Sequence, residues 1–131
     1  MQTNNSILLV DDDLTSNFIA EKIIKKSGNS KSIQSVKNGK EALNYILENC
    51  LYDYKENCPQ IILLDLHMPV MDGFDFLKHL SIEMPNYIEA FKIFILTSSS
   101  NPKDVEIANQ YHIDGYINKP LNAEKVKLLI E

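Results

Sequence analysis

Acidic side chains follow two short apolar runs in this sequence. Residues 7–10 are followed directly by Asp11 and Asp12, and residues 61–64 are followed by Asp65. Carboxylates held within several ångströms of one another repel strongly, unless a cation lies among them or some of them protonate. Oxygen ligands with room for water favour Mg²⁺ or Mn²⁺ over zinc. The pattern therefore predicts a divalent-metal site.

Two further polar residues end later apolar runs. Thr97 follows residues 92–96, and Lys119 follows residues 115–118. A divalent cation and an ammonium group would together neutralise the oxygens of a transferring phosphoryl group. An aspartate carboxylate can act as the nucleophile, and the Thr97 hydroxyl could then sense the acyl phosphate by a hydrogen bond. The chemistry indicated is phosphoryl transfer to an aspartate.

The elements that must position these residues alternate along the chain. Apolar runs predict strands at 7–10, 32–36, 61–64, 92–96 and 115–118, and helical periodicity predicts helices at about 15–27, 40–48, 74–82, 102–111 and 122–130. Such alternation predicts one α/β domain with a five-stranded parallel sheet and helices on both faces. The polar residues above then gather at the carboxyl edge of that sheet.

Capping residues support the predicted helix starts. Asp13 is expected to begin the first helix, Asp72 to serve helix entry, Asn101 to cap a helix that starts with Pro102, and Asn122 to cap the last one. The segments 49–60 and 83–92 are long for connections in such a fold, and the sequence does not indicate their role.

Length and composition limit the classes of protein. The chain has 131 residues, enough for a single domain over residues 1–131, and its net charge of −5 disfavours direct binding to nucleic acid or anionic membranes. No signal peptide or membrane span is evident, which predicts a soluble cytoplasmic protein. Cys50 and Cys58 form no metal or redox motif and are expected to be free thiols.

Four motifs in this order resemble the receiver domain of two-component response regulators. They are ILLVDDD at 7–13, LDLHMPVMDG at 64–73, TS at 97–98 and KP at 119–120, and the resemblance spans essentially the whole chain. It implies a doubly wound, flavodoxin-like fold with strand order 2-1-3-4-5.

The resemblance also implies roles for individual residues. Asp65 is expected to be the phosphoacceptor and a ligand of Mg²⁺, with Mn²⁺ as a substitute. Asp12 is expected to bind the metal directly and Asp11 mainly through water. The backbone carbonyl of His67 is expected to complete the protein ligands, whereas its side chain is expected to influence dephosphorylation and not to act as a catalyst.

A switch is implied as well. Thr97 is expected to move toward the phosphoryl group, Lys119 to pair with it, and Tyr116 to change rotamer between exposed and buried positions. The bond between Lys119 and Pro120 is expected to be cis.

The implied partners are proteins. The phosphoryl donor is expected to be a histidine kinase or a histidine phosphotransfer protein, and the output an unknown protein target that contacts the fourth long helix, the fifth strand and the last helix. Phosphorylation-dependent dimerisation stays open. Only self-phosphorylation and self-dephosphorylation are expected as activities, so the chain is not predicted to be a metabolic enzyme.

The sequence leaves three alternatives open. An aspartate-nucleophile phosphatase of the haloacid dehalogenase type would need a second aspartate at the position of His67. A flavodoxin-like cofactor binder would need a glycine-rich or hydroxyl-rich loop where Asp11 to Asp13 stand. The chain could also be a receiver fragment of a hybrid kinase.

Overall fold

The computed structural model describes residues 5–28, 30–50 and 58–130, and these form five strands and six helices. The strands are β1 (Asn5–Val10), β2 (Ser30–Val36), β3 (Ile61–Leu64), β4 (Lys92–Thr97) and β5 (Gly115–Asn118). The helices are α1 (Leu14–Ser27), α2 (Gly39–Cys50), α3 (Gly73–Glu83), α4 (Tyr87–Ala90), α5 (Pro102–Ala108) and α6 (Ala123–Ile130).

The five strands form one parallel sheet in the order β2-β1-β3-β4-β5. Val10 lies opposite Leu64 and Leu64 opposite Ile95, so β1, β3 and β4 end almost level with one another. The predicted fold class and strand order are confirmed. The residues that follow these strands accordingly share one edge of the sheet.

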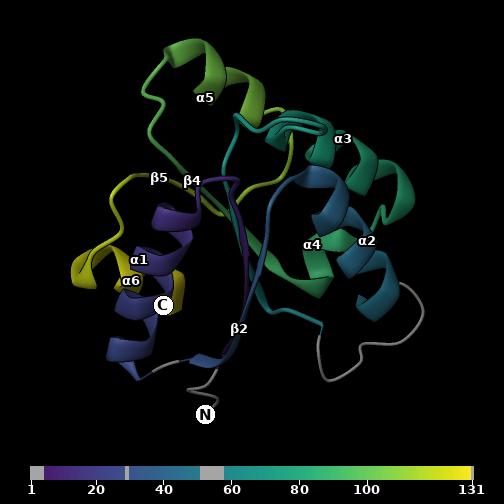
Figure 1. Cartoon of the computed structure of the whole chain (residues 1–131). Coiled ribbons are helices and arrows are strands. Elements are labelled where there is room, and N and C mark those ends of the chain that lie inside the picture. The colour runs from purple at the N-terminus through teal and green to yellow at the C-terminus, as the bar shows by residue number, and fades with distance from the viewer. Residues whose placement is uncertain (1–4, 29, 51–57, 131) are drawn as a thin grey trace.

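Helices cover both faces of the sheet, as Figure 1 shows. On one face α1 and α6 pack against alternate strand residues, among them Leu9 and Leu63. On the other face α2, α3, α4 and α5 contribute to a second cluster that includes Leu8 and Ile62. Burial on both faces explains why the central strands read as continuous apolar runs.

The helix starts follow the predicted capping chemistry. Asp13 caps α1 by accepting hydrogen bonds from the backbone N–H groups of Thr15 and Ser16. The Asp72 side chain caps α3, and Asn101 caps α5 with Pro102 in its first turn. Asn122 Oδ1 accepts from the Lys125 N–H at 2.9 Å at the start of α6. These caps set where α1, α3, α5 and α6 begin.

Three features differ from the sequence-based expectations. Cys50 and Cys58 are joined by a disulfide, so the expectation of free thiols is wrong. The bond ties the end of α2 to the segment that leads into β3. Residues 83–92 contain the short helix α4, which was not predicted and which brings Tyr87 and Phe91 into the core. Helix α5 ends at Ala108, three residues earlier than expected.

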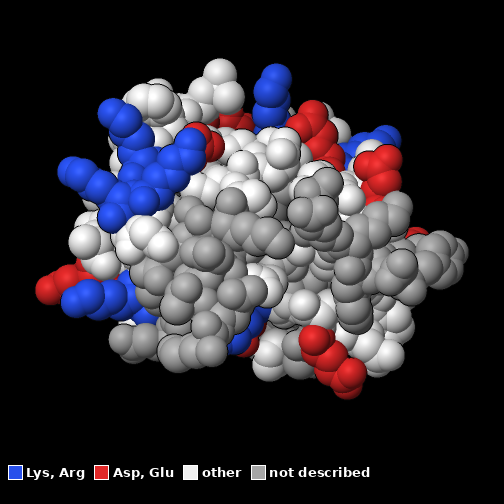
Figure 2. Space-filling view, turned by 90° about the horizontal axis from the view of Figure 1, so that it is seen from below, with Lys and Arg blue, Asp and Glu red and all other residues white. Residues whose placement is uncertain are grey.

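Lysines gather at the edge of the sheet opposite the carboxyl ends of the strands. Figure 2 shows basic side chains gathered on the side of α1 and α6, whose last turns contain Lys25, Lys26 and Lys127. Cations there complement the helix dipoles. None of the helices within the described ranges combines the length and the apolar character that crossing a bilayer requires.

Candidate functional site

Three carboxylates meet at the carboxyl edge of the sheet. Asp11 and Asp12 follow β1, Asp65 follows β3, and one oxygen from each lies within 4.8 Å of the others. Asp11 and Asp65 are buried, at 5% and 8% exposure, whereas Asp12 faces solvent. The structure therefore brings together the three acids that the sequence predicts as metal ligands.

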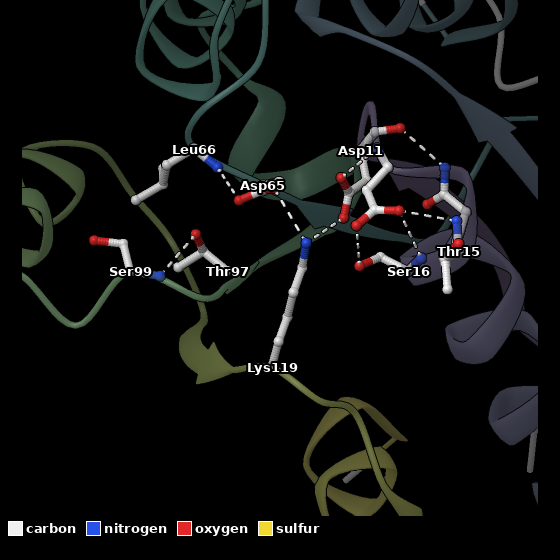
Figure 3. Close-up of polar contacts among 10 residues, drawn as sticks. Asp11, Thr15, Ser16, Asp65, Leu66, Thr97, Ser99 and Lys119 are labelled. Carbon is white, nitrogen blue, oxygen red and sulfur yellow. Dashed lines mark hydrogen bonds and ion pairs between the residues drawn. The ribbon is translucent and has the colours of Figure 1, made fainter.

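Lys119 supplies the positive charge beside them, as Figure 3 shows. Its Nζ donates to Asp11 Oδ2 at 2.5 Å and to Asp65 Oδ2 at 3.2 Å. Burial alone would lower the pKa of Lys119, but the hydrogen bond to Asp11 and the charges of both acids outweigh it and raise that pKa. Burial raises the pKa of Asp11, against the effect of Lys119. The Lys119–Pro120 bond is cis, as expected.

The donor set fits a small divalent cation. Three carboxylates and one ammonium leave two formal negative charges, which a divalent ion would balance. Two ligands of one Mg²⁺ lie at most about 4 Å apart, so the carboxylates need only a small adjustment to share it. Asp11, Asp12 and Asp65 could thus hold Mg²⁺ or Mn²⁺.

Backbone contacts fix the two buried carboxylates. Asp65 Oδ1 accepts the N–H of Leu66 at 2.8 Å, and Asp11 Oδ1 accepts the N–H of Asp13 at 2.9 Å. Asn17, a buried residue of α1 that sequence reasoning did not select, donates its side-chain amide to the Asp11 carbonyl at 2.9 Å. Each acid therefore has one oxygen held by backbone and one facing Lys119.

The loop after β3 is shaped by a close backbone contact. A Cβ on Gly73 would lie 2.4 Å from the carbonyl oxygen of Asp65, so only glycine fits there. Gly73 N–H donates to the Leu66 carbonyl at 2.9 Å, closing the loop. Val70 has a φ of 71°, and the N–H of Met71 donates to the Pro69 carbonyl, which together describe a γ-turn.

Thr97 and Tyr116 occupy the other side of the site. Thr97 is 1% exposed, and its Oγ1 accepts the N–H of Ser99 at 3.3 Å. Tyr116 is half-buried, and its hydroxyl donates to the Ser99 carbonyl at 3.1 Å. Burial raises the pKa of Tyr116. Thr97 and Tyr116, two of the three predicted switch residues, thus contact the same loop residue, Ser99.

The side chain of His67 points to a partner that sequence reasoning missed. Its Nε2 lies 2.7 Å from Asp104 Oδ2, and Ser99 Oγ donates to the same oxygen at 2.6 Å. The hydrogen bonds from Ser99 and then His67 hold the pKa of Asp104 below its ordinary value. In the sequence Asp104 shows only as an acid in the first turn of a helix, which is a common feature.

Comparison with known proteins identifies the family. The sequence profile of the Response regulator receiver domain matches residues 7–131. The chain belongs to this family. The match supports the predicted receiver domain and excludes two alternatives, the phosphatase of the haloacid dehalogenase type and the flavodoxin-like cofactor binder.

Individual relatives agree with this assignment. A two-component response regulator from Cytophaga hutchinsonii is 31% identical with a TM-score of 0.86, over 97% of this receiver domain and 94% of that chain. The probable methanogenesis regulatory protein FilR2 of Methanothrix harundinacea is 29% identical over 126 residues, which are 95% of this chain and 78% of FilR2.

A third relative bears on the metal. The response regulator Rcp1 of Synechocystis was crystallised in a Mn²⁺-bound form, which is 25% identical with a TM-score of 0.75, over 95% of this chain and 88% of that one. Phosphorylation and Mg²⁺ binding are typical of the family. Receiver domains are regulatory proteins that accept phosphoryl groups from histidine kinases or phosphotransfer proteins.

Proposed function

We propose that this receiver domain accepts a phosphoryl group on Asp65 in a Mg²⁺-dependent reaction and thereby switches a protein-binding surface. The observation that carries the proposal is the placement of Asp65 Oδ2, which faces Lys119 Nζ at 3.2 Å within a cluster of three carboxylates. Asp11, Asp12, Asp65 and the backbone carbonyl of His67 would hold the metal ion. When bound, that ion withdraws negative charge from the phosphoryl oxygens.

The protein groups prepare Asp65 as a nucleophile. Because Asp65 Oδ1 is held by the Leu66 N–H, the carboxylate keeps a fixed orientation. A carboxylate oxygen forms the new bond to phosphorus, and the bond from phosphorus to the donor's histidine nitrogen breaks with its electron pair. Lys119 Nζ, which lies 3.2 Å from Asp65 Oδ2, would stabilise the negative charge that spreads over the phosphoryl oxygens during the transfer.

The acyl phosphate would be sensed by hydrogen bonds. The Thr97 hydroxyl oxygen accepts the backbone N–H of Ser99. The hydroxyl proton of Thr97 can therefore be donated to a phosphoryl oxygen. A shift of Thr97 would carry Ser99 with it, and Tyr116 is bonded to Ser99. The output surface would then be α5, β5 and α6, and its target a protein. Dimerisation on phosphorylation and a cytoplasmic location stay predictions.

A protein donor has an apolar surface to contact beside the site. Helix α1 starts directly after the acid cluster and exposes Leu14 at 68% and Phe18 at 60%. These residues are four apart and so share one face of the helix. A histidine kinase or phosphotransfer protein that covers the opening above Asp65 would bury them, whereas a small phosphoryl donor would not.

The test compares the wild type with Asp65→Asn after incubation with acetyl phosphate. We expect the intact mass of the wild type to rise by one phosphoryl group only when Mg²⁺ or Mn²⁺ is present, and we expect no rise for the variant. An equal rise for both proteins would rule out Asp65 as the acceptor. Binding of beryllofluoride to the wild type, measured in parallel, reports a competent site even if acetyl phosphate reacts slowly.

A further inference from the structure

Asp104 joins the two loops that border the phosphoacceptor. It lies in the first turn of α5, and its Oδ2 contacts Ser99 Oγ at 2.6 Å and His67 Nε2 at 2.7 Å. Ser99 belongs to the loop after β4, and His67 to the loop after β3, two residues beyond Asp65. Since β3 and β4 are neighbours in the sheet, the contact closes a bridge across the edge where Asp65 lies.

The burial of Asp104 and the short distances indicate that this bridge is a specific contact. The Asp104 side chain is only 13% exposed, although the His67 side chain is 60% exposed. Hydrogen bonds to a carboxylate are shorter and stronger than those between neutral groups, and both distances here are short. An exposed imidazole would otherwise sample several rotamers, so Asp104 selects one of them.

The bridge also reaches the predicted switch residues. Ser99, which Asp104 holds by its hydroxyl, donates its backbone N–H to Thr97 Oγ1 at 3.3 Å and accepts from the Tyr116 hydroxyl at 3.1 Å. The position of Ser99 therefore determines where the Thr97 hydroxyl can point. Loss of the Asp104 carboxylate would loosen both loops at once.

We propose that Asp104 is a positioning residue that prolongs the lifetime of the phosphoryl group, an inference that rests on the proposed phosphorylation of Asp65. In hydrolysis a water oxygen forms a bond to phosphorus, and the bond from phosphorus to the Asp65 oxygen breaks with its electron pair. The proton of that water passes to solvent, which leaves the free carboxylate and inorganic phosphate. By fixing His67 and Ser99, Asp104 limits the approach of that water and keeps the Thr97 hydroxyl on the acyl phosphate.

The experiment follows the loss of the phosphoryl group by intact mass after acetyl phosphate is removed. We expect Asp104→Asn to lose it about tenfold faster than the wild type, as the loss of one charge-assisted hydrogen bond in a rate-controlling contact implies. Glu106→Gln is the matched control, because it removes one negative charge from an exposed position of the same helix. Ser99→Ala, which removes one arm of the bridge, should also shorten the lifetime.

A combined variant separates positioning from a general loss of stability. If His67 and Asp104 act through the same bridge, His67→Ala with Asp104→Asn should lose the group no faster than the faster single variant, and the thermal midpoint of Asp104→Asn should stay near that of the wild type. Lifetimes of Asp104→Asn and the wild type within twofold of each other, or multiplicative effects of the two changes, would overturn the inference. A wild type that neither becomes phosphorylated nor binds beryllofluoride would instead overturn the proposed function, and this inference with it.

Discussion

Neighbouring acids at the end of β1 have different surroundings and therefore different predicted roles. Asp12 is one of the three carboxylates that could hold a metal ion, whereas Asp13 caps α1 and accepts two backbone N–H groups. Asn caps a helix about as well as Asp does, but its neutral amide is a poor substitute for a carboxylate ligand of Mg²⁺. This pair of residues allows a matched test of the metal site.

We predict that Asp12→Asn weakens Mg²⁺ binding by about tenfold or more, because one charged ligand is lost. Asp13→Asn should leave the affinity within about twofold, since the cap is kept. Isothermal titration of both variants with MgCl₂ measures the difference. An equal loss of Mg²⁺ affinity in both variants would show that the total charge of the segment controls binding and that Asp12 is not a direct ligand.

The sequence predicted the charged centre of the site but not its supporting contacts. Asp11, Asp65 and Lys119 each stand directly after a strand, and parallel strands bring such positions to one edge. The roles of Ser99 and Asp104 depend on rotamers and on how far α5 lies from the loop after β3. No spacing in the sequence reports those distances.

The two segments to which the sequence assigns no role, 49–60 and 83–92, both contribute residues to one core cluster. Cys50 and Met84 lie in the same core cluster as Tyr87 of α4, on the face of the sheet that α2 and α3 cover. The Tyr87 hydroxyl accepts the N–H of His112 at 3.0 Å, so α4 also holds the segment before β5. Such long-range contacts follow from packing in three dimensions, which explains why periodicity did not reveal them.

The disulfide should stabilise the fold measurably. Its cysteines are 8 residues apart, and closing a loop of that size stabilises a native state by about 2.5 kcal/mol in the chain-entropy model. We predict that Cys58→Ser lowers the free energy of unfolding in urea by about that amount. A reductant should lower the stability of the wild type similarly and leave Cys58→Ser unchanged. Equal stability of both proteins without reductant would contradict a stabilising bond.

The two helical layers of the domain follow largely from the path of the chain through the sheet. The chain runs from β1 outward to β2 and then back past β1 to β3, β4 and β5. Because such crossovers are right-handed, α1 lies on one face of the sheet and α2 to α5 lie on the other. Helix α6, which follows the last strand, packs beside α1. Alternation of strands and helices predicted the two layers. The order itself came from the resemblance to receiver domains, because short buried strands carry no mark of their neighbours.

The exposed face of α1 should distinguish a protein donor from a small one. We predict that Phe18→Ser slows phosphorylation by a histidine phosphotransfer protein that is active on the wild type, by about tenfold, because burying one aromatic side chain contributes more than 1 kcal/mol. Phosphorylation by acetyl phosphate should stay unchanged. Leu128→Ser on α6, where Leu128 is 57% exposed, is the control. A donor that phosphorylates Phe18→Ser at the wild-type rate must contact another surface.

Phosphorylation of Asp65 is tested most directly by locating the phosphoryl group chemically. Borohydride reduces an acyl phosphate of aspartate to homoserine and leaves free carboxylates intact, so peptide mass spectrometry can identify the modified residue. After treatment with acetyl phosphate and Mg²⁺, we predict homoserine at position 65 and at no other acid of the cluster. Conversion at Asp11 or Asp12, or conversion that does not depend on the metal ion, would contradict Mg²⁺-dependent phosphorylation of Asp65.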